Sequence, residues 1–175
     1  MPSRVARRTI PAMSSHHPSP AAVKLPPNAR VAVIAARFND HIVDTLLKDC
    51  VHRLEEAGVE KVAVYRVPGA FELPTAAKMA ARTRQFHAVI CLGCIIRGDT
   101  PHFDFVAGEA AAGISRVALD EVLPVIFGVL TTNTEQQAID RTNGVHSHAG
   151  INSADAALEM IGLAGQLKAA MERLS

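Results

Sequence analysis

Residues 88–105, A-V-I-C-L-G-C-I-I-R-G-D-T-P-H-F-D-F, pass from an apolar run to the start of a helix. The run is rich in β-branched residues, as in a strand that is buried on both faces. The turn after it contains Arg97, then Gly98, which has no Cβ, then Asp99 and Thr100, two residue types that cap helices. Pro101 suits a first helical position. An arginine, unpaired helix N–H groups and His102 therefore meet at one point. Such a point has the parts for binding an anion and moving a proton, and we take it as the candidate active site.

The composition is that of one globular domain. A chain of 175 residues with 49% hydrophobic and 20% charged residues is long enough to bury a core. Its apolar runs are all shorter than the ~18 residues that a membrane helix needs. Residues 1–30 carry basic but no acidic side chains, so the rest of the chain is mildly acidic. With few aromatic residues as well, the sequence predicts neither a nucleic-acid partner nor a membrane partner.

Residues 1–28 are rich in Pro, Ser, Ala and Arg and have too little apolar surface to offset the entropy cost of ordering. We expect a flexible basic tail there, although its Arg and Ser content without acids also fits an organellar targeting peptide. Residues 29–175 would then form the single domain.

The three cysteines, Cys50, Cys91 and Cys94, lie in apolar contexts and indicate reduced thiols in a cytoplasmic protein. The spacing of Cys91 and Cys94 is that of a redox pair, but inside a strand the two side chains point to opposite faces. Disulfide chemistry is therefore disfavoured. His146 and His148 have no second cluster of ligands beside them, so we expect no metal site.

Four apolar segments have the length and composition of buried strands: 30–36, 61–67, 87 to about 95, and 123–130. The first three are followed by helical segments, from Asn39 or Asp40 to Gly58, from Phe71 to about position 84, and from 101 to about 119. Such a chain requires right-handed crossovers and a parallel sheet covered on both sides, an α/β fold.

Two further helices are expected after the last strand. Thr132 and Glu135 make a capping box for a short helix that runs through Arg141. The last helix is expected to begin near Ser153, with an apolar stripe of Ala156, Ala157, Met160, Ile161, Ala164 and Leu167.

Side chains that could bind a ligand or take part in a reaction lie near the ends of all four strands. Ligands of parallel sheets bind beyond the carboxyl ends of the strands. These candidates are Phe38 and Asn39; Gly69, Phe71 and Glu72; residues 97–102; and Phe127 with Thr131. The start of a helix favours a neutral imidazole at His102, which can act as a base. The two phenylalanines Phe38 and Phe127 fit either the core or a stack on a planar ring. Because the glycine patterns of dinucleotide and Walker-type sites are absent from the sequence, a site of either kind is disfavoured.

In order and spacing, these residues resemble the lumazine synthase family, which performs the penultimate step of riboflavin synthesis. The matching blocks are A-A-R-F-N-D (35–40), V-P-G-A-F-E-L-P (67–74), G-C-I-I-R-G-D-T-P-H-F-D-F-V (93–106), P-V-I-F-G-V-L-T-T (124–132) and E-Q-Q-A-I-D-R (135–141). The resemblance implies a three-layer α/β/α flavodoxin-like sandwich with a four-stranded parallel sheet. It also implies a transferase, without a cofactor, that condenses 5-amino-6-ribitylamino-pyrimidinedione with 3,4-dihydroxy-2-butanone 4-phosphate.

The resemblance implies roles for individual residues. Pyrimidine and ribityl binding falls to Phe38, Asn39, Ala70, Phe71, Glu72, Cys94, Ile95, Ile96 and Phe127. Phosphate binding falls to Arg97, Gly98, Asp99, Thr100 and Arg141. His102 would transfer protons, with Arg141 as the second catalytic residue. Phe127 and Arg141 resemble residues that a neighbouring subunit supplies, which implies a homopentamer. A decamer, a shell of sixty subunits and association with riboflavin synthase stay open.

One position departs from the family pattern. Eight residues after Arg141 the family usually has a lysine near the phosphate, and here that place holds Ala149. We expect weaker anion affinity, which His148 offsets only when it is protonated. Two other functions stay open: a paralogue that stores or senses a flavin or lumazine with weakened catalysis, and a related riboflavin-forming enzyme. The phosphate-handling residues disfavour the second of these.

Overall fold

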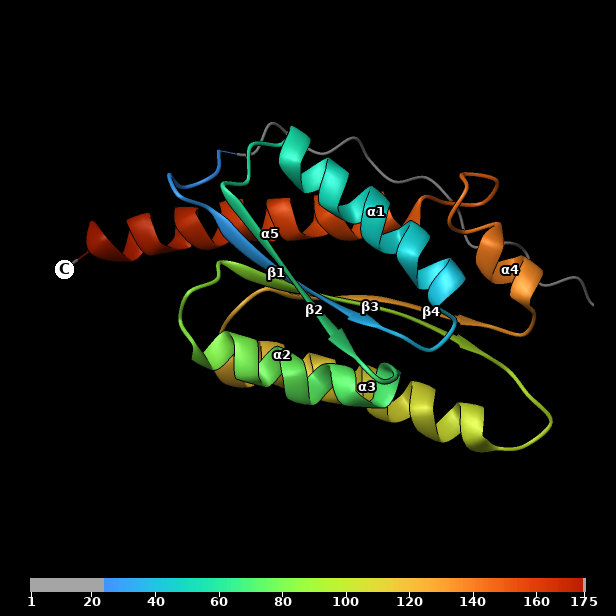
Figure 1. Ribbon diagram of the computed structural model, residues 1–175. Helices are drawn as coiled ribbons and strands as arrows, with labels where there is room; N and C mark the ends of the chain where they lie inside the picture. Colours follow the sequence, from blue (N-terminus) through green and yellow to red (C-terminus); the bar gives the residue numbers. More distant parts are fainter. Residues whose placement is uncertain (1–23, 175) are drawn as a thin grey trace, which may run out of the picture.

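The computed structural model describes residues 24–174 and contains a four-stranded parallel sheet with the order β2-β1-β3-β4 (Figure 1). The strands are β1 (Arg30–Ala36), β2 (Lys61–Val67), β3 (Ala88–Ile96) and β4 (Val125–Thr132). Helices cover the sheet on both sides, so the chain is a three-layer α/β/α sandwich of the flavodoxin-like kind. The predicted fold class is confirmed.

The helices are α1 (Asp40–Glu56), the 3-10 turn η1 (Ala70–Glu72), α2 (Leu73–Arg82), α3 (His102–Glu121), α4 (Glu135–Ile139) and α5 (Ala149–Glu172). Helices α1 and α5 lie on one face of the sheet and α2 and α3 on the other (Figure 1). Alternation along β1 explains the two cores, because successive strand residues point to opposite faces. Val31 and Val33 join the core under α1 and α5, whereas Ala32 and Ile34 join the core under α2 and α3.

Strand β3 is the central element that the opening stretch predicted. It pairs with β1 from Ala88 to Leu92 and with β4 from Val89 to Ile96, and its first eight residues are buried. Strand β2 lies at the edge of the sheet, where Val64 and Tyr65 are 45% and 49% exposed. At this edge the helices shield β2 less completely than they shield the central strands β1 and β3.

Two capping assignments differ from the prediction. The side chain of Thr134, not Thr132, accepts a hydrogen bond from Gln137 N at the start of α4, since the hydroxyl of Thr132 bonds to Thr134 O instead. At the start of α3 the N-cap residue is Pro101, and neither Asp99 nor Thr100 makes a side-chain cap bond. The helix thus begins with His102 and with uncapped N–H groups.

Helix α5 begins at Ala149, four residues before the predicted start near Ser153. Gly150 permits this, because a Cβ there would lie 2.5 Å from the carbonyl oxygen of Leu46, and α5 packs directly on α1. Half of the predicted stripe is misplaced: Ala157 and Ile161 are buried, but Met160, Ala164 and Leu167 are exposed. The inward residues are instead Ser153, Ala154, Ala157, Leu158 and Ile161, and positions 163–174 are exposed.

All three cysteines are buried and free. Cys91 and Cys94 belong to the cores on opposite faces of the sheet, as their spacing predicted. Burial raises the pKa of Cys50 and Cys91 to about 12 and that of Cys94 to about 11. None of the three is a reactive thiol.

Residues 1–23 of the expected tail lie outside the described residues, and Leu25 already packs against the core. Within the described part of the chain, none of the helices has the length and apolar character needed to cross a membrane. Residues 24–174 also hold no group of His, Cys, Asp and Glu side chains arranged to bind a metal ion.

Candidate active site

A pocket of about 580 Å³ lies beyond the carboxyl ends of β1 and β3. This is the switch point of the sheet, where the chain leaves β1 toward β2 on one side and leaves β3 toward β4 on the other. Eight of the nine residues expected to bind the pyrimidine and ribityl groups line it: Phe38, Asn39, Ala70, Phe71, Glu72, Cys94, Ile95 and Ile96. Gly98, Thr100 and His102 line it as well.

The segment after β1 supplies an aromatic ring and an amide. Hydrogen bonds from Arg37 N to Val67 O and from Phe38 N to Pro68 O continue the sheet beyond its last strand residues. They hold the Phe38 side chain at the pocket, where it is 73% exposed. Asn39 has a left-handed backbone, with φ 57°, and its Nδ2 donates to Cys94 O at 2.9 Å. This bond joins the end of β1 to β3 across the floor of the pocket.

The turn after β2 supplies a carboxylate. Gly69 N donates to Glu72 Oε2 at 2.9 Å, and Glu72 lines the pocket. One carboxylate oxygen is thereby held by the backbone, and the carboxylate can accept hydrogen bonds from a bound hydroxyl group. A Cβ on Gly69 would lie 3.2 Å from this oxygen, so a glycine suits the close approach.

The segment after β3 supplies the helix start. His102 is exposed at the first position of α3 and lines the pocket together with Gly98 and Thr100. Because the first N–H groups of α3 lack a side-chain cap, they and the positive end of the helix dipole favour an anion at this point.

Arg97 does not line the pocket. Its Nη1 and Nη2 donate to the two oxygens of Asp104 at 3.2 and 2.8 Å, and its Nε donates to Asn133 Oδ1 at 3.2 Å. The guanidinium carbon also lies 4.1 Å from the centroid of the Phe103 ring. Hydrogen bonding to Arg97 lowers the pKa of Asp104, and the same bonds raise the pKa of Arg97. This guanidinium is therefore engaged with α3, and its role in phosphate binding stays a prediction.

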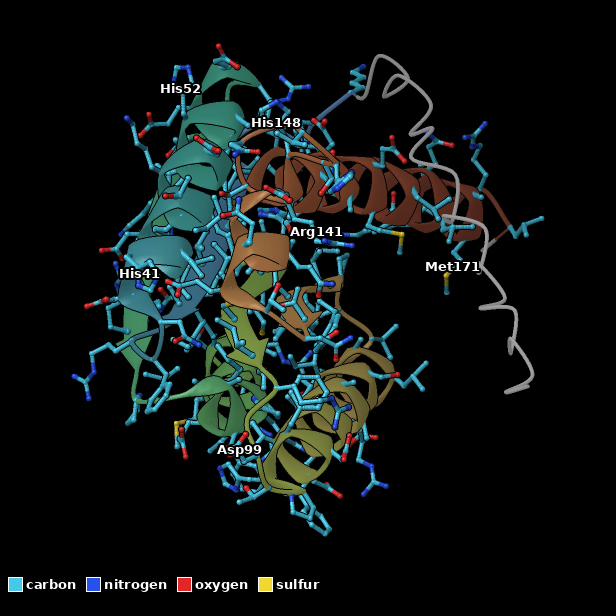
Figure 2. All side chains as sticks on the ribbon, turned by 90° about the vertical axis from the view of Figure 1, so that its right-hand side faces the viewer. His41, His52, Asp99, Arg141, His148 and Met171 are labelled. Carbon is cyan, nitrogen blue, oxygen red and sulfur yellow. The ribbon has the colours of Figure 1, made fainter. Side chains whose placement is uncertain are left out.

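Three other expected residues also lie outside the pocket of this chain: Asp99, Phe127 and Arg141. Phe127 is 43% exposed on β4, which lies at the edge of the sheet and pairs with β3 on one side only. Arg141 follows α4, and its Nη1 donates to Gln137 O at 2.7 Å. Figure 2 looks onto the ends of the strands and shows Asp99 and Arg141 on opposite sides of them. Among the residues that the structure describes, the pocket lining includes no arginine and no lysine.

Comparison with known proteins settles the family. The family model of 6,7-dimethyl-8-ribityllumazine synthase matches residues 28–164, which is most of the chain. The chain belongs to the lumazine synthase family. Two relatives named 6,7-dimethyl-8-ribityllumazine synthase, from Yersinia pestis (strain Pestoides F) and Yersinia pseudotuberculosis serotype O:1b (strain IP 31758), are each 46% identical over 145 residues. The alignments cover 81% of this chain and 93% of each relative.

The lumazine synthase match contains every residue of the pocket, including three that the sequence reasoning missed: Phe103, Phe105 and Val106. They come from the first two turns of α3, and Phe105 is 71% exposed. The sequence held an indication of these residues, because two phenylalanines close to a candidate histidine are unusual in a chain with 4% aromatic residues.

The departure from the lumazine synthase pattern lies at the start of α5. Ala149 N donates to Arg141 O at 2.9 Å, so the residue in the usual lysine place is tied to the segment that holds Arg141. His148 precedes it, and its ring lies so close to Gly144 that a Cβ there would be 2.4 Å from Nε2. Gly144 has φ +84°, which also favours glycine.

Proposed function

We propose that this protein condenses 5-amino-6-ribitylamino-pyrimidinedione with 3,4-dihydroxy-2-butanone 4-phosphate, forming 6,7-dimethyl-8-ribityllumazine and releasing water and phosphate. Family membership supports this function. The observation that carries it is the pocket itself, which brings Phe38, Glu72 and His102 from three segments to one point beyond the strand ends.

Each group in the pocket suits one part of the reaction. The exposed ring of Phe38 offers a face on which a flat pyrimidine stacks, and the carboxylate of Glu72 accepts hydrogen bonds from ribityl hydroxyls. The N–H groups at the start of α3, after Gly98 and Thr100, bind the phosphate. The imidazole of His102 moves protons as the amine attacks the ketone and the ring closes. Holding both substrates in register supplies much of the rate.

We infer that the complete site lies between two copies of the chain. The described pocket lining contains no arginine or lysine, and a cation would add charge-assisted hydrogen bonds to those that the helix start gives a phosphate. Arg141 and Phe127 lie outside the pocket of their own chain, and a neighbouring copy in a homopentamer brings them to it. A decamer or a sixty-subunit shell would repeat the same contact, and such a surface leaves room for association with riboflavin synthase. The three buried free thiols suit the reducing cytoplasm.

The test is to mix the purified protein with both substrates and to follow lumazine formation by absorbance and fluorescence. We expect turnover, and we expect His102→Ala to reduce kcat by ~10²–10⁴-fold. His52→Ala is the matched control, because His52 is an exposed histidine on α1 that does not line the pocket. Tight flavin binding without turnover would contradict the proposal and favour a binding protein.

A further inference from the structure

We propose that Arg97 is a positioning residue that holds the first turn of α3, and with it His102, against the pocket. This inference rests on the proposed function and deepens it, because it gives Arg97 a role in proton transfer in place of phosphate binding. Its basis is the network that the guanidinium makes with Asp104, Asn133 and Phe103.

The backbone of Arg97 is anchored to the sheet. Its N–H donates to Thr132 O at 2.9 Å, which extends the β3–β4 pairing one residue beyond β3. From this fixed point the side chain reaches Asp104 in the first turn of α3 and Asn133 before α4. One side chain thus ties the sheet, α3 and the loop before α4 to one another.

The turn between Arg97 and α3 has little else to hold it. Residues 98–100 are exposed and make no hydrogen bond to any other part of the chain that the structure describes. His102 follows this turn directly, and its own side chain has no hydrogen-bond partner among residues 24–174. Beside the backbone bond from Asp104 N to Pro101 O at 3.0 Å, the pair of bonds from Arg97 to Asp104 is therefore a side-chain restraint on the turn that carries His102.

The guanidinium also supports a wall of the pocket. Its carbon lies 4.1 Å from the centre of the Phe103 ring, and Phe103 lines the pocket between His102 and Asp104 in sequence. Stacking on one face and a two-pronged bond at the edge fix the plane of the guanidinium relative to α3. The ammonium group of a lysine is not planar and cannot donate two parallel hydrogen bonds to a carboxylate, so it cannot replace these contacts.

The same contacts argue against direct phosphate binding. Three of the N–H groups of Arg97 are engaged, and its charge faces the carboxylate of Asp104. The hydrogen bonds lower the pKa of Asp104, so the carboxylate stays ionised at neutral pH and competes with any approaching anion.

The experiment compares Arg97→Gln, Arg97→Lys, Asp104→Asn and the double variant Arg97→Gln/Asp104→Asn in the lumazine assay. Because a small misplacement of a reacting group costs up to about 100-fold, we expect each single variant to lower kcat about 10- to 100-fold. The KM for the phosphate substrate should change less than about twofold, and the double variant should be no worse than the singles. Arg97→Lys should not rescue activity.

A phosphate-binding Arg97 predicts a different outcome and would overturn the inference. The KM for the phosphate substrate would then rise in Arg97→Gln, Arg97→Lys would keep most of the affinity, and Asp104→Asn would bind phosphate more tightly. Arg82→Gln is the matched control, because Arg82 Nε donates to Glu121 Oε1 at 3.1 Å between α2 and the far end of α3. It should leave kcat and KM unchanged.

A second readout does not depend on turnover. The ring resonances of His102, assigned by their loss in His102→Ala, should shift in both Arg97→Gln and Asp104→Asn but not in Arg82→Gln. Unchanged His102 ring resonances in folded Arg97→Gln and Asp104→Asn would overturn the inference. Wild-type turnover is measured first, so its absence counts against the proposed function alone, while the His102 resonances still decide the role of Arg97.

Discussion

In the proposed shared site, each active site would draw His102 from one copy and Arg141 from the next. Two inactive variants should then restore activity to each other when they assemble together. His102→Ala removes the proposed proton-transfer group, and Arg141→Ala removes the proposed cation for the phosphate. His102 lines the pocket of its own chain, whereas Arg141 bonds to Gln137 O on the other side of the strand ends (Figure 2). A copy with either change can therefore still complete a site with a suitable neighbour.

The magnitude follows from ring geometry. In a closed ring every contact has the same direction, so each site takes His102 from one neighbour and Arg141 from the other. In a random 1:1 assembly half of the copies keep each residue, and about one quarter of the sites hold both. We expect about 25% of the wild-type rate, whereas the His102→Ala protein alone retains at most ~1%.

The assay uses co-expression with two different affinity tags, purification over both, and lumazine formation as the readout. Variants that are purified separately and then mixed should stay inactive as long as subunits do not exchange. The matched control pairs His102→Ala with Phe38→Ala, because both residues line the pocket of the same chain. Every site of that hybrid carries a defect, and its rate should equal the mean of the two variants. A His102→Ala/Arg141→Ala hybrid no faster than its own mean would refute the shared site.

Three further predictions concern stability. Gly150→Ala should lower the free energy of unfolding by about 1–3 kcal/mol in urea titrations, because its Cβ would lie 2.5 Å from Leu46 O; Gly165→Ala, with open space around it, should not. Arg53→Ala should cost about 1–3 kcal/mol, because Arg53 Nε donates to the half-buried Asp155 at 2.6 Å, and a double variant with Asp155→Ala should be less than additive. The free energy of unfolding should fall as pH rises above about 9 by up to about 1.4 kcal/mol per pH unit for each cysteine, since the folded thiols stay protonated to a pKa of about 11 or 12 while the unfolded ones ionise. Cys50→Ala should remove its share of that pH dependence, and an unchanged slope would contradict the raised thiol pKa.

Part of the site was predictable because it follows directly from the strand ends. The residues after β1, β2 and β3 line one pocket, as expected for a parallel sheet. Phe127 did not follow this rule within one chain, because it is the third residue of β4 and does not lie at the carboxyl end of the strand. The aromatic residues after His102 were not predicted, because they lie within the first two turns of α3 and not at the end of a strand.

By itself the sequence determined the strands, the helices and their order, because burial on both faces of β3 and the periodicity of each helix are properties of neighbouring residues. It also determined which family the chain joins. Only the tertiary structure decided the partner of Arg97, the start of α5 and the absence of a cation from the described pocket lining. The physical reason is that these depend on contacts between elements. Asp104, Asn133 and Phe103 surround the guanidinium only after α3 and the loop before α4 have packed at the end of the sheet.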